Sequence, residues 1–400
     1  MKPSLPQGTR DFSPEIVRKR TLIFDTIRRQ FELFGFEPLE TPAFENIETL
    51  MVKYGDEGDK LIFKILNNGL ERVEKHVQAR EDFEKVLSGK NVKSLTERAM
   101  KYDLTIPFAR YVAMNRGTLS FPFKRYQIQN VWRADKPQRG RYREFTQCDA
   151  DIVGSKSLLN EIDLIQIYKN VFAQLNIPVE ICINNRKILS ALADLCGGQS
   201  RLTDITIAID KLDKTSLDKV LEELSSKQID EHSIAVLQQY LSLKTTGGPN
   251  QQTIEKLSAM FADSDSGQQG IAELSYLANY FNEISIDVTL ARGLNYYTGT
   301  ILEVKPLGIQ MGSIGGGGRY DDLTGLFGVP DLPGVGISFG VDRIYDVMDE
   351  LKLFPEGIQK SVEVMLVNCG EAFQQRNLEI LQYLRSNQIS CELYPDAIKF

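Results

Sequence analysis

Charged and apolar side chains alternate along residues 121–154, FPFKRYQIQNVWRADKPQRGRYREFTQCDADIVG. Two strand-like runs flank a loop at 136–141 that contains Pro137 and Gly140, and a hairpin is the simplest fold for them. Because side chains alternate across a strand, one face of the hairpin should carry Arg125, Gln127, Gln129, Arg133, Arg143, Phe145, Gln147, Asp149 and Asp151. Unpaired charge is costly to bury, so we expect this face to line a polar pocket. The opposite face of the second strand should pack against the core through Thr146, Cys148, Ala150 and Ile152.

The same hairpin concentrates positive charge. Residues 122–143 contain one acid, Asp135, and seven basic residues: Lys124, Arg125, Arg133, Lys136, Arg139, Arg141 and Arg143. The whole chain is acidic, with a formal charge of -7 from 47 Lys and Arg against 54 Asp and Glu, which excludes a protein that coats nucleic acid through its global charge. Guanidinium groups match phosphate oxygens in pairs, and we therefore expect a phosphate-bearing ligand at the hairpin. A solvent-exposed charged hairpin is the alternative.

Two glycine clusters invite comparison with nucleotide-binding motifs. Neither matches G-x-x-x-x-G-K-[ST], and residues 334–340 (GVGISFG) have one residue too many for G-x-G-x-x-G, with no strand predicted before them. A P-loop and a Rossmann fingerprint are therefore excluded. The cluster Gly315 to Gly318 is expected to allow close backbone approach beside a site, and a tight turn is the alternative.

Metal and disulfide frameworks are not expected. The chain has two histidines and five cysteines, without C-x-x-C or H-E-x-x-H. No stretch approaches the roughly 18 apolar residues that a membrane span needs, and the N-terminus lacks the apolar core of a signal peptide. We expect a soluble, cytoplasmic, thiol-reduced protein without a membrane partner.

The length of 400 residues and a hydrophobic content of 42% predict two to four globular domains. Apolar periodicity predicts helices over 14–34 and 157–175 and hairpin strands at 123–133 and 143–153. Residues 71–97 are dense in charge and predict an exposed helix and loop. A strand and then a helix with Pro107 in its first turn should follow this charged segment. Pro42 on extended structure indicates an edge or an interface.

Composition changes to Leu, Ala, Ser, Gln and Lys between about 190 and 284, which predicts a helical segment inserted between pieces of one sheet. From about Lys360 the pattern is strand, helix, strand. About 40 residues are too few to fold alone without disulfides or metal, so this part either docks on the rest of the chain or belongs to a domain that continues beyond the sequence. We expect the second.

Four segments resemble the histidyl-tRNA synthetases, a family of class II aminoacyl-tRNA synthetases. In chain order these segments are RYREFTQCDAD, ARGLNYYTGT, GGGGRYDD and GVGISFGVDRI. The resemblance extends from PQGTRDF near the N-terminus to the C-terminal strand-helix-strand unit. It implies an α+β fold with a mixed, mainly antiparallel sheet flanked by helices, a helical insertion and the start of an α/β anticodon-binding domain.

The resemblance also implies a division of the chain. Residues 1–189 would form the first part of the catalytic domain, with class II motifs 1 and 2, and residues 285–355 would form its second part, with the histidine-specific motifs and motif 3. Residues 190–284 would form a helical insertion domain that reaches toward the tRNA acceptor stem. Residues 360–400 would form a partial anticodon-binding domain. Motif 1, FGFEPLETPAFENIETL, would form the interface of a homodimer and so account for Pro42 at an edge.

The implied activity is that of a histidine-tRNA ligase, which uses ATP to make histidyl-adenylate from L-histidine and then transfers histidine to the 3′ end of tRNA(His). Such chemistry consists mainly of positioning and charge neutralisation. By match to the family motifs, Arg133 would contact the α-phosphate and the substrate carboxylate, and Arg292 would be the catalytic arginine at the α-phosphate. The expected ATP contacts are Arg133, Arg141, Phe145 against adenine, and Arg343 at the γ-phosphate, with Mg²⁺ on the β- and γ-phosphates.

The matching histidine pocket is polar at both ends. Its expected residues are Asp103, Thr105 and Gln147 around the ammonium, Asp151 and Tyr297 around the imidazole with Tyr296 beside them, and Arg133 and Arg292 at the carboxylate. Partners on both ring nitrogens would reject apolar analogues. Many bacterial members carry Glu at the positions of Asp103 and Asp151, so these shorter carboxylates must be brought closer by the backbone or by water, and YDLTIPFARY is more similar to the eukaryotic and archaeal pattern. Alternatively, Tyr296 belongs to the core and Thr105 caps the following helix.

Two other functions compete with the ligase. One is the non-aminoacylating paralogue that regulates the first enzyme of histidine biosynthesis, and the other is a synthetase-like module that senses uncharged tRNA. The paralogue generally lacks the C-terminal domain and a full set of catalytic arginines. Arg133, Arg292 and Arg343 are all present here, which favours the ligase.

Overall fold

The computed structural model describes residues 2–51, 61–138, 140–213, 215–227, 229–243, 250–291, 297–358 and 362–396. The chain divides into two compact units. One comprises Met1–Asp11 and Leu22–Leu353, and the other comprises Phe12–Thr21 and Phe354–Phe400.

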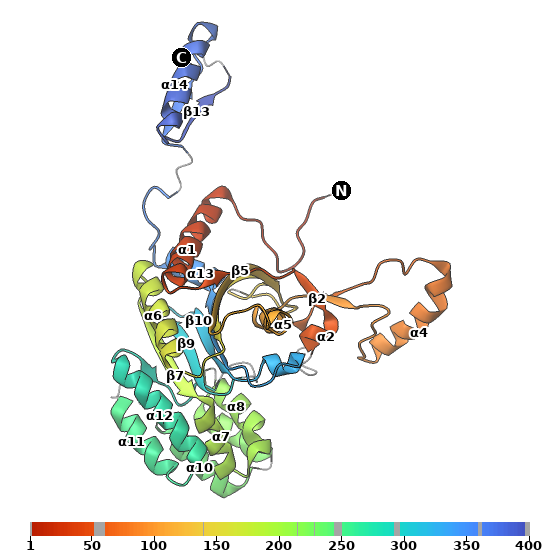
Figure 1. The fold of residues 1–400 in the computed structure, drawn as a ribbon, viewed down its shortest axis with the longest axis vertical. Coiled ribbons are helices and arrows are strands. Elements are labelled where there is room, and N and C mark those ends of the chain that lie inside the picture. The colour runs from red at the N-terminus through yellow and green to blue at the C-terminus, as the bar shows by residue number, and fades with distance from the viewer. Residues whose placement is uncertain are drawn as a thin grey trace. The chain divides into compact units, whose positions relative to one another are not determined.

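An eight-stranded sheet organises the larger unit (Figure 1). Its order is β1-β5-β6-β11-β10-β9-β7-β8, and its strands are β1 (Glu37–Pro38), β5 (Phe123–Trp132), β6 (Glu144–Val153), β7 (Val179–Asn185), β8 (Ser285–Ile286), β9 (Thr300–Pro306), β10 (Gly315–Tyr320) and β11 (Gly334–Gly340). The pairs β1/β5 and β7/β8 are parallel, and the remaining pairs are antiparallel. The predicted mixed, mainly antiparallel α+β fold is confirmed.

The apolar face of this sheet forms the main core. On β6 the predicted packing residues Cys148, Ala150 and Ile152 are fully buried, which confirms the direction of alternation. Helix α6 (Leu159–Gln174) covers this face with Tyr168, whose ring lies 4.7 Å from that of Phe339 on β11. Helix α1 (Pro14–Leu33) ends just before Gly35, and α13 (Val341–Glu350) follows β11 directly.

The glycine cluster is a central strand rather than a turn. Strand β10 pairs along its length with β11 and also with β9. A Cβ on Gly318 would approach the carbonyl oxygen of Thr300 to 2.6 Å, and one on Gly336 of β11 would approach Oδ1 of Asp151 to 2.0 Å. Glycine is therefore required at Gly336 by a carboxylate of β6 and at Gly318 by the backbone of β9, and the expected close backbone approach is present.

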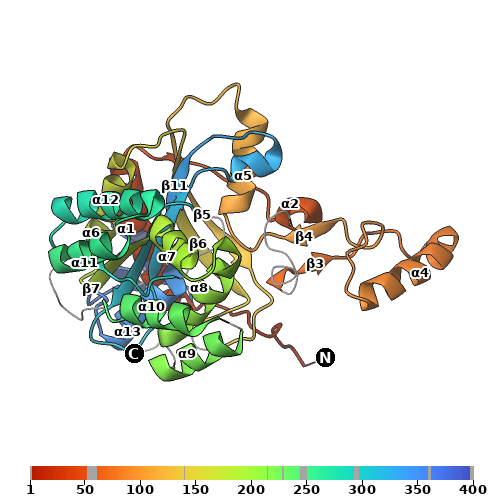
Figure 2. The ribbon, with the colours of Figure 1, turned by 90° about the horizontal axis from the view of Figure 1, so that it is seen from below.

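Helices follow β7 and return the chain to β8. They are α7 (Arg186–Leu195), α8 (Leu202–Asp210), α9 (Leu217–Ser226), α10 (Glu231–Leu241), α11 (Asn250–Met260) and α12 (Asp265–Tyr280), with the 3-10 helices η2 (Gln199–Arg201) and η3 (Lys211–Asp213). Figures 1 and 2 show that they gather beyond the β7 side of the sheet. The predicted helical composition between two sheet strands is thus observed.

A second, three-stranded sheet of the larger unit has the order β2-β4-β3, from β2 (Phe44–Asn46), β3 (Lys64–Ile65) and β4 (Arg98–Met100). The accompanying helices are α2 (Ile47–Met51), α4 (His76–Leu87), α5 (Thr105–Asn115) and the 3-10 helices η1 (Val73–Lys75) and η4 (Thr324–Phe327). Most side chains of α4 are exposed, as predicted for that charged segment. Helix α5 is buried through Ile106, Phe108 and Val112, and Pro107 lies in its first turn.

The smaller unit contains the predicted strand, helix and strand: β12 (Val364–Val367), α14 (Glu371–Ser386) and β13 (Cys391–Tyr394), with the two strands parallel. All five cysteines of the chain are free thiols, and Cys369 is exposed. Among the described helices, none is both long and apolar enough to cross a membrane.

A buried ion pair supports the glycine strand. Arg319 of β10 donates from Nε and Nη2 to Glu161 of α6 at 2.6 and 2.7 Å, and the Glu161 side chain is fully buried. Replacing Glu161 by Gln leaves a buried guanidinium without its counter-charge, so we expect the free energy of unfolding to fall by about 3–5 kcal/mol, measured by chemical denaturation. Glu223→Gln, which breaks the partly exposed pair with Lys211, should change it little. Equal losses in the two variants would contradict this account.

Candidate active site

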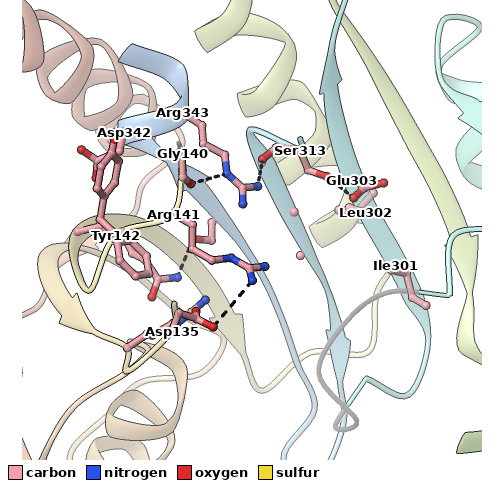
Figure 3. Close-up of a pocket in the computed structure, with 18 of the residues that line it drawn as sticks. Asp135, Gly140, Arg141, Tyr142, Ile301, Leu302, Glu303, Ser313, Asp342 and Arg343 are labelled. Carbon is pink, nitrogen blue, oxygen red and sulfur yellow. Dashed lines mark hydrogen bonds and ion pairs between the residues drawn. The ribbon is translucent and has the colours of Figure 1, made fainter. Parts of the chain in front are cut away.

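Two adjoining cavities lie on the polar face of the larger unit's sheet, with volumes of about 330 Å³ and about 80 Å³. Figure 3 shows the larger one. Six residues line both cavities: Arg133, Gln147, Tyr297, Gly316, Gly317 and Ser338. The cavities therefore share a wall built from β6, β10, β11, the segment after β5 and Tyr297 ahead of β9.

The smaller cavity brings together the described residues predicted to bind histidine: Asp103, Thr105, Arg133, Gln147, Asp151 and Tyr297. Asp103 precedes α5, and its Oδ1 accepts a hydrogen bond from the backbone N–H of Ile106 at 3.1 Å. The carboxylate that caps this helix is thus that of Asp103, while Thr105 lines the cavity as the first residue of α5. Gln147 donates to the hydroxyl of Ser338 at 3.1 Å.

Asp151 is held by protein groups on both sides. Its Oδ1 accepts from the Tyr320 hydroxyl at 2.5 Å, and its Oδ2 lies 2.7 Å from Nη2 of Arg125. Arg125 stands opposite Asp151 on β5, is fully buried, and lies 4.2 Å from the ring centroid of Phe108. This pairing fixes the orientation of the short carboxylate in the cavity wall.

The prediction that the polar hairpin face avoids burial is wrong in its inner half. Arg125 and Gln127 are fully buried, and Asp149 and Asp151 are each 3% exposed. The prediction assumed that the charges of this face would be unpaired. In the structure Arg125 and Asp151 form an ion pair, which compensates much of the charge of these two side chains. Residues of this face line a polar pocket, as predicted, but Asp149 and Asp151 do so as buried side chains.

The larger cavity is lined by Arg141, Phe145 and Arg343, the described residues predicted to bind ATP together with Arg133. Arg343 donates from Nε to the carbonyl of Gly140 at 3.1 Å and from Nη1 to the carbonyl of Ser313 at 2.7 Å, as Figure 3 shows. The hairpin loop is thereby fastened to the first turn of α13.

Arg133 lies where the two cavities meet. It donates from Nε to the carbonyl of Tyr102 at 2.9 Å, and its guanidinium lies 5.1 Å from the ring centroid of Phe145. A guanidinium held in this way can face anionic groups in both cavities at once. Arg292 and Tyr296, which were also predicted at the site, lie outside the described residues.

Only part of the basic cluster on the hairpin faces a cavity. Among its described members Arg133 and Arg141 line the larger cavity, whereas Lys124 pairs with Asp163 and Arg125 with Asp151. Arg143 contacts the N-terminal segment: its backbone N–H donates to the carbonyl of Gly8 at 2.9 Å. The two cluster members that line the larger cavity are the two that the family motifs named as ATP contacts.

Several lining residues were not predicted. They include Asp135, Tyr142, Glu303, Ser313 and Asp342 in the larger cavity, Tyr320 in the smaller one and Ser338 in both. Alternation along the hairpin placed Asp149 on the correct face, and only its role was missed. Arg10 contacts both Asp342 and Tyr142. Its Nη2 lies 2.5 Å from Oδ1 of Asp342, and its Cζ lies 3.2 Å from the ring centroid of Tyr142. A contact between such distant positions leaves no local pattern in the sequence.

Burial shifts the protonation of the carboxylates in the smaller cavity. Loss of hydration raises the pKa of Asp103 to about 6 and that of Asp149 to about 7, while nearby arginines act in the opposite direction. The pKa of Asp151 is also raised by burial, against the effect of Arg125. The cavity thus favours a ligand that brings positive charge or N–H donors.

These raised pKa values predict how stability varies with pH. Between about pH 4 and pH 7 the folded protein binds more protons at Asp149 than the unfolded chain does, so this carboxyl stabilises the fold at low pH and the contribution is lost as the pH rises. Asp149→Asn should therefore raise the melting temperature relative to the unsubstituted protein more at pH 8 than at pH 5. The control Asp163→Asn changes a partly exposed carboxylate and should give the same difference at both pH values. A pH-independent effect of Asp149→Asn would contradict the assignment.

Comparisons with known proteins identify the family. The family model described as histidyl-tRNA synthetase matches residues 69–344. A protein named histidine-tRNA ligase from Christiangramia forsetii is 51% identical over 409 residues, covering 100% of this chain and 88% of the relative. A crystal structure of histidyl-tRNA synthetase from Nostoc sp. PCC 7120 aligns with a TM-score of 0.82 and 29% identity over 100% of this chain and 88% of that chain.

A structure described as an ATP phosphoribosyltransferase regulatory subunit/histidyl-tRNA synthetase from Bacillus halodurans C also aligns, with a TM-score of 0.77 over 98% of this chain and 93% of that chain. At 20% identity it bears on the fold alone. The family model and the curated relative each cover most of the chain, and this chain belongs to the histidyl-tRNA synthetase family.

Proposed function

We propose that this chain is a catalytically competent histidine-tRNA ligase. It activates L-histidine with ATP to histidyl-adenylate and transfers the histidyl group to the 3′ end of tRNA(His). The observation that carries the proposal is the pair of cavities that meet at Arg133, one rich in carboxylates and the other lined by arginines. A cationic amino acid fits the first cavity, and a nucleoside triphosphate fits the second.

The activation step joins the two substrates at the shared wall. A carboxylate oxygen of histidine attacks the α-phosphorus of ATP, the bond to the bridging oxygen breaks, and pyrophosphate leaves with its electron pair. Arg133 neutralises charge on the α-phosphate and holds the histidine carboxylate, and Arg292 is the second arginine at the α-phosphate. Guanidinium groups that are already oriented lower the barrier without reorganising during the reaction.

In the larger cavity Arg343 binds the γ-phosphate, Arg141 assists it and Phe145 stacks on adenine. Arg343 suits this role because two backbone carbonyls already orient its guanidinium. In the smaller cavity Asp103, Thr105 and Gln147 hold the ammonium, while Asp151, Tyr297 and Tyr296 surround the imidazole. Apolar amino acids would leave these buried polar groups unpaired and are rejected for that reason.

Mg²⁺ belongs to this proposal as the partner of the β- and γ-phosphates. The described residues contain no group of three or more side chains that could hold a metal ion by themselves. Mg²⁺ is commonly held by substrate phosphates with one or two carboxylates. Glu303 and Asp342, which line the larger cavity, are the candidates to hold it. When bound, the ion neutralises phosphate charge.

We also propose a cytoplasmic homodimer whose interface includes the motif 1 segment, and the division into catalytic, insertion and anticodon-binding domains at the predicted boundaries. Phe44 of β2 is exposed, which suits an interface. The regulatory subunit of histidine biosynthesis and the tRNA sensor are less favoured, because the described catalytic arginines are present and line the cavities.

The proposed reaction predicts ATP/pyrophosphate exchange that depends on L-histidine. We expect exchange with histidine and background rates with other amino acids, because only histidine supplies ring nitrogens and an ammonium to the smaller cavity. The measurement is isotope exchange at saturating Mg²⁺ across the standard amino acids. Background exchange with histidine, from protein that is folded by circular dichroism, would refute the ligase.

Arg292 provides a second test. Arg292→Ala should lower the exchange rate at saturating substrates by about 100-fold or more, since a charge acting on the transition state is lost, while equilibrium binding of histidine is partly retained. Arg376→Ala is the matched control, because this arginine is largely exposed on α14. Unchanged exchange in Arg292→Ala would remove Arg292 from its assigned role.

A further inference from the structure

We propose that Asp149 is a further histidine-binding residue, whose Oδ1 accepts a hydrogen bond from a ring N–H of the substrate. The inference deepens the proposed function and rests on it. Asp149 was not among the residues expected at the site from the family motifs.

The position of Asp149 follows from strand register. It lies on β6 between Gln147 and Asp151 and therefore points to the same face as both of them. Its neighbours across the sheet are Gln127 on β5 and Ser338 on β11, and Ser338 in turn stands opposite Gly316 on β10. A Cβ added to Gly316 would meet one atom within 4 Å, a backbone oxygen at 3.4 Å. The space above the row formed by Asp149, Ser338 and Gly316 is consequently open to a ligand.

The two aspartates of β6 differ in what their oxygens already bind. Both oxygens of Asp151 have protein partners, Tyr320 and Arg125. By contrast, the Asp149 carboxylate has a side-chain hydrogen bond with Ser338, but its buried Oδ1 has no hydrogen-bond partner among the described residues. The residue as a whole is 3% exposed. Asp149 lines the smaller cavity, and a buried carboxylate oxygen without a hydrogen-bond partner is costly unless a ligand that enters this cavity donates to it.

The depth of Asp149 indicates which end of histidine it meets. Arg133 and Gln147 line both cavities, so the reacting carboxylate of histidine must lie at that shared wall. Asp149, Asp151 and Tyr320 line the smaller cavity alone. A substrate with its carboxylate at the shared wall extends its side chain toward these deeper groups, which places a ring N–H at Asp149.

Charge supports the same assignment. Three carboxylates line the smaller cavity, those of Asp103, Asp149 and Asp151, against one arginine, Arg133, while Arg125, which pairs with Asp151, lies outside its lining. Hydration lost on burial raises the pKa of Asp149 to about 7, an effect that Arg125 and the hydrogen bond with Ser338 only partly offset. An N–H donor from the substrate supplies the missing compensation.

The test compares Asp149→Ala with the unsubstituted protein in pyrophosphate exchange. We expect the KM for histidine to rise by about 10- to 100-fold, the range for a lost hydrogen bond to a charged group, with the KM for ATP unchanged within twofold. Asp149→Asn keeps an acceptor oxygen and should recover part of the loss. Asp163→Asn, on the partly exposed surface of α6, is the control and should leave both constants unchanged. A KM for histidine within twofold of normal in Asp149→Ala overturns the proposal, as does an equal rise in both KM values.

Inhibition by 3-(imidazol-4-yl)propanoate separates ring from ammonium recognition. This probe keeps the imidazole and the carboxylate but lacks the amino group. We expect Asp149→Ala to raise its inhibition constant by the same factor as the KM for histidine, and an unchanged constant would overturn the assignment to the ring. If Asp149→Ala does not fold, Asp149→Ser serves in both measurements, because the serine hydroxyl is attached to Cβ and its oxygen lies short of the position of Oδ1.

The proposal can fail independently of the ligase function. Absence of histidine-dependent exchange in the unsubstituted protein refutes the ligase itself. Normal exchange together with unaltered histidine and probe constants in the Asp149 variants refutes only the role of Asp149.

Discussion

The antiparallel register of β6, β11 and β10 is the constraint on which the site depends. It places Asp151 opposite Gly336, and Asp149 opposite Ser338, so that each carboxylate faces a position with little or no side chain. Side chains on a strand alternate with a period of two, and a slip of one residue would turn both aspartates into the apolar core. The two cavities exist because small residues on the central strands leave room above the carboxylates of the neighbouring strand.

Burying those carboxylates requires positive charge beneath the cavity. Arg125 supplies it at Asp151, and a second polar cluster lies further along the same strand, where Lys101 donates to the carbonyl of Thr41 at 3.0 Å and also to Gln129. Burial lowers the pKa of Lys101 to about 8. The segment after β1 is thereby tied to β5 through buried polar groups, and the position of the hairpin depends on both contacts.

Residue periodicity in the sequence was sufficient to predict which face of a strand each side chain occupies. Alternation along β6 correctly assigned Asp149 and Asp151 to one face and Cys148 and Ala150 to the other, and the family motifs led to residues that line the cavities. It was insufficient where the outcome depends on long-range pairing. No local pattern distinguishes the buried Arg125 from the cavity-lining Arg133, because the difference arises from the position of Asp151 on the neighbouring strand.

A glycine-rich strand at the centre of a sheet is intrinsically weak, because glycine loses more backbone freedom on folding and packs no side chain. The fold compensates from the opposite face. The Tyr168 hydroxyl of α6 lies 2.9 Å from the carbonyl oxygens of both Gly316 and Ser338, which share its one O–H donor. Arg319 at the end of β10 pairs with Glu161 of the same helix. Helix α6 thus stabilises the strands from the apolar side. On the polar side the same strands can remain free of bulky side chains, which is the condition for a cavity that admits a ligand.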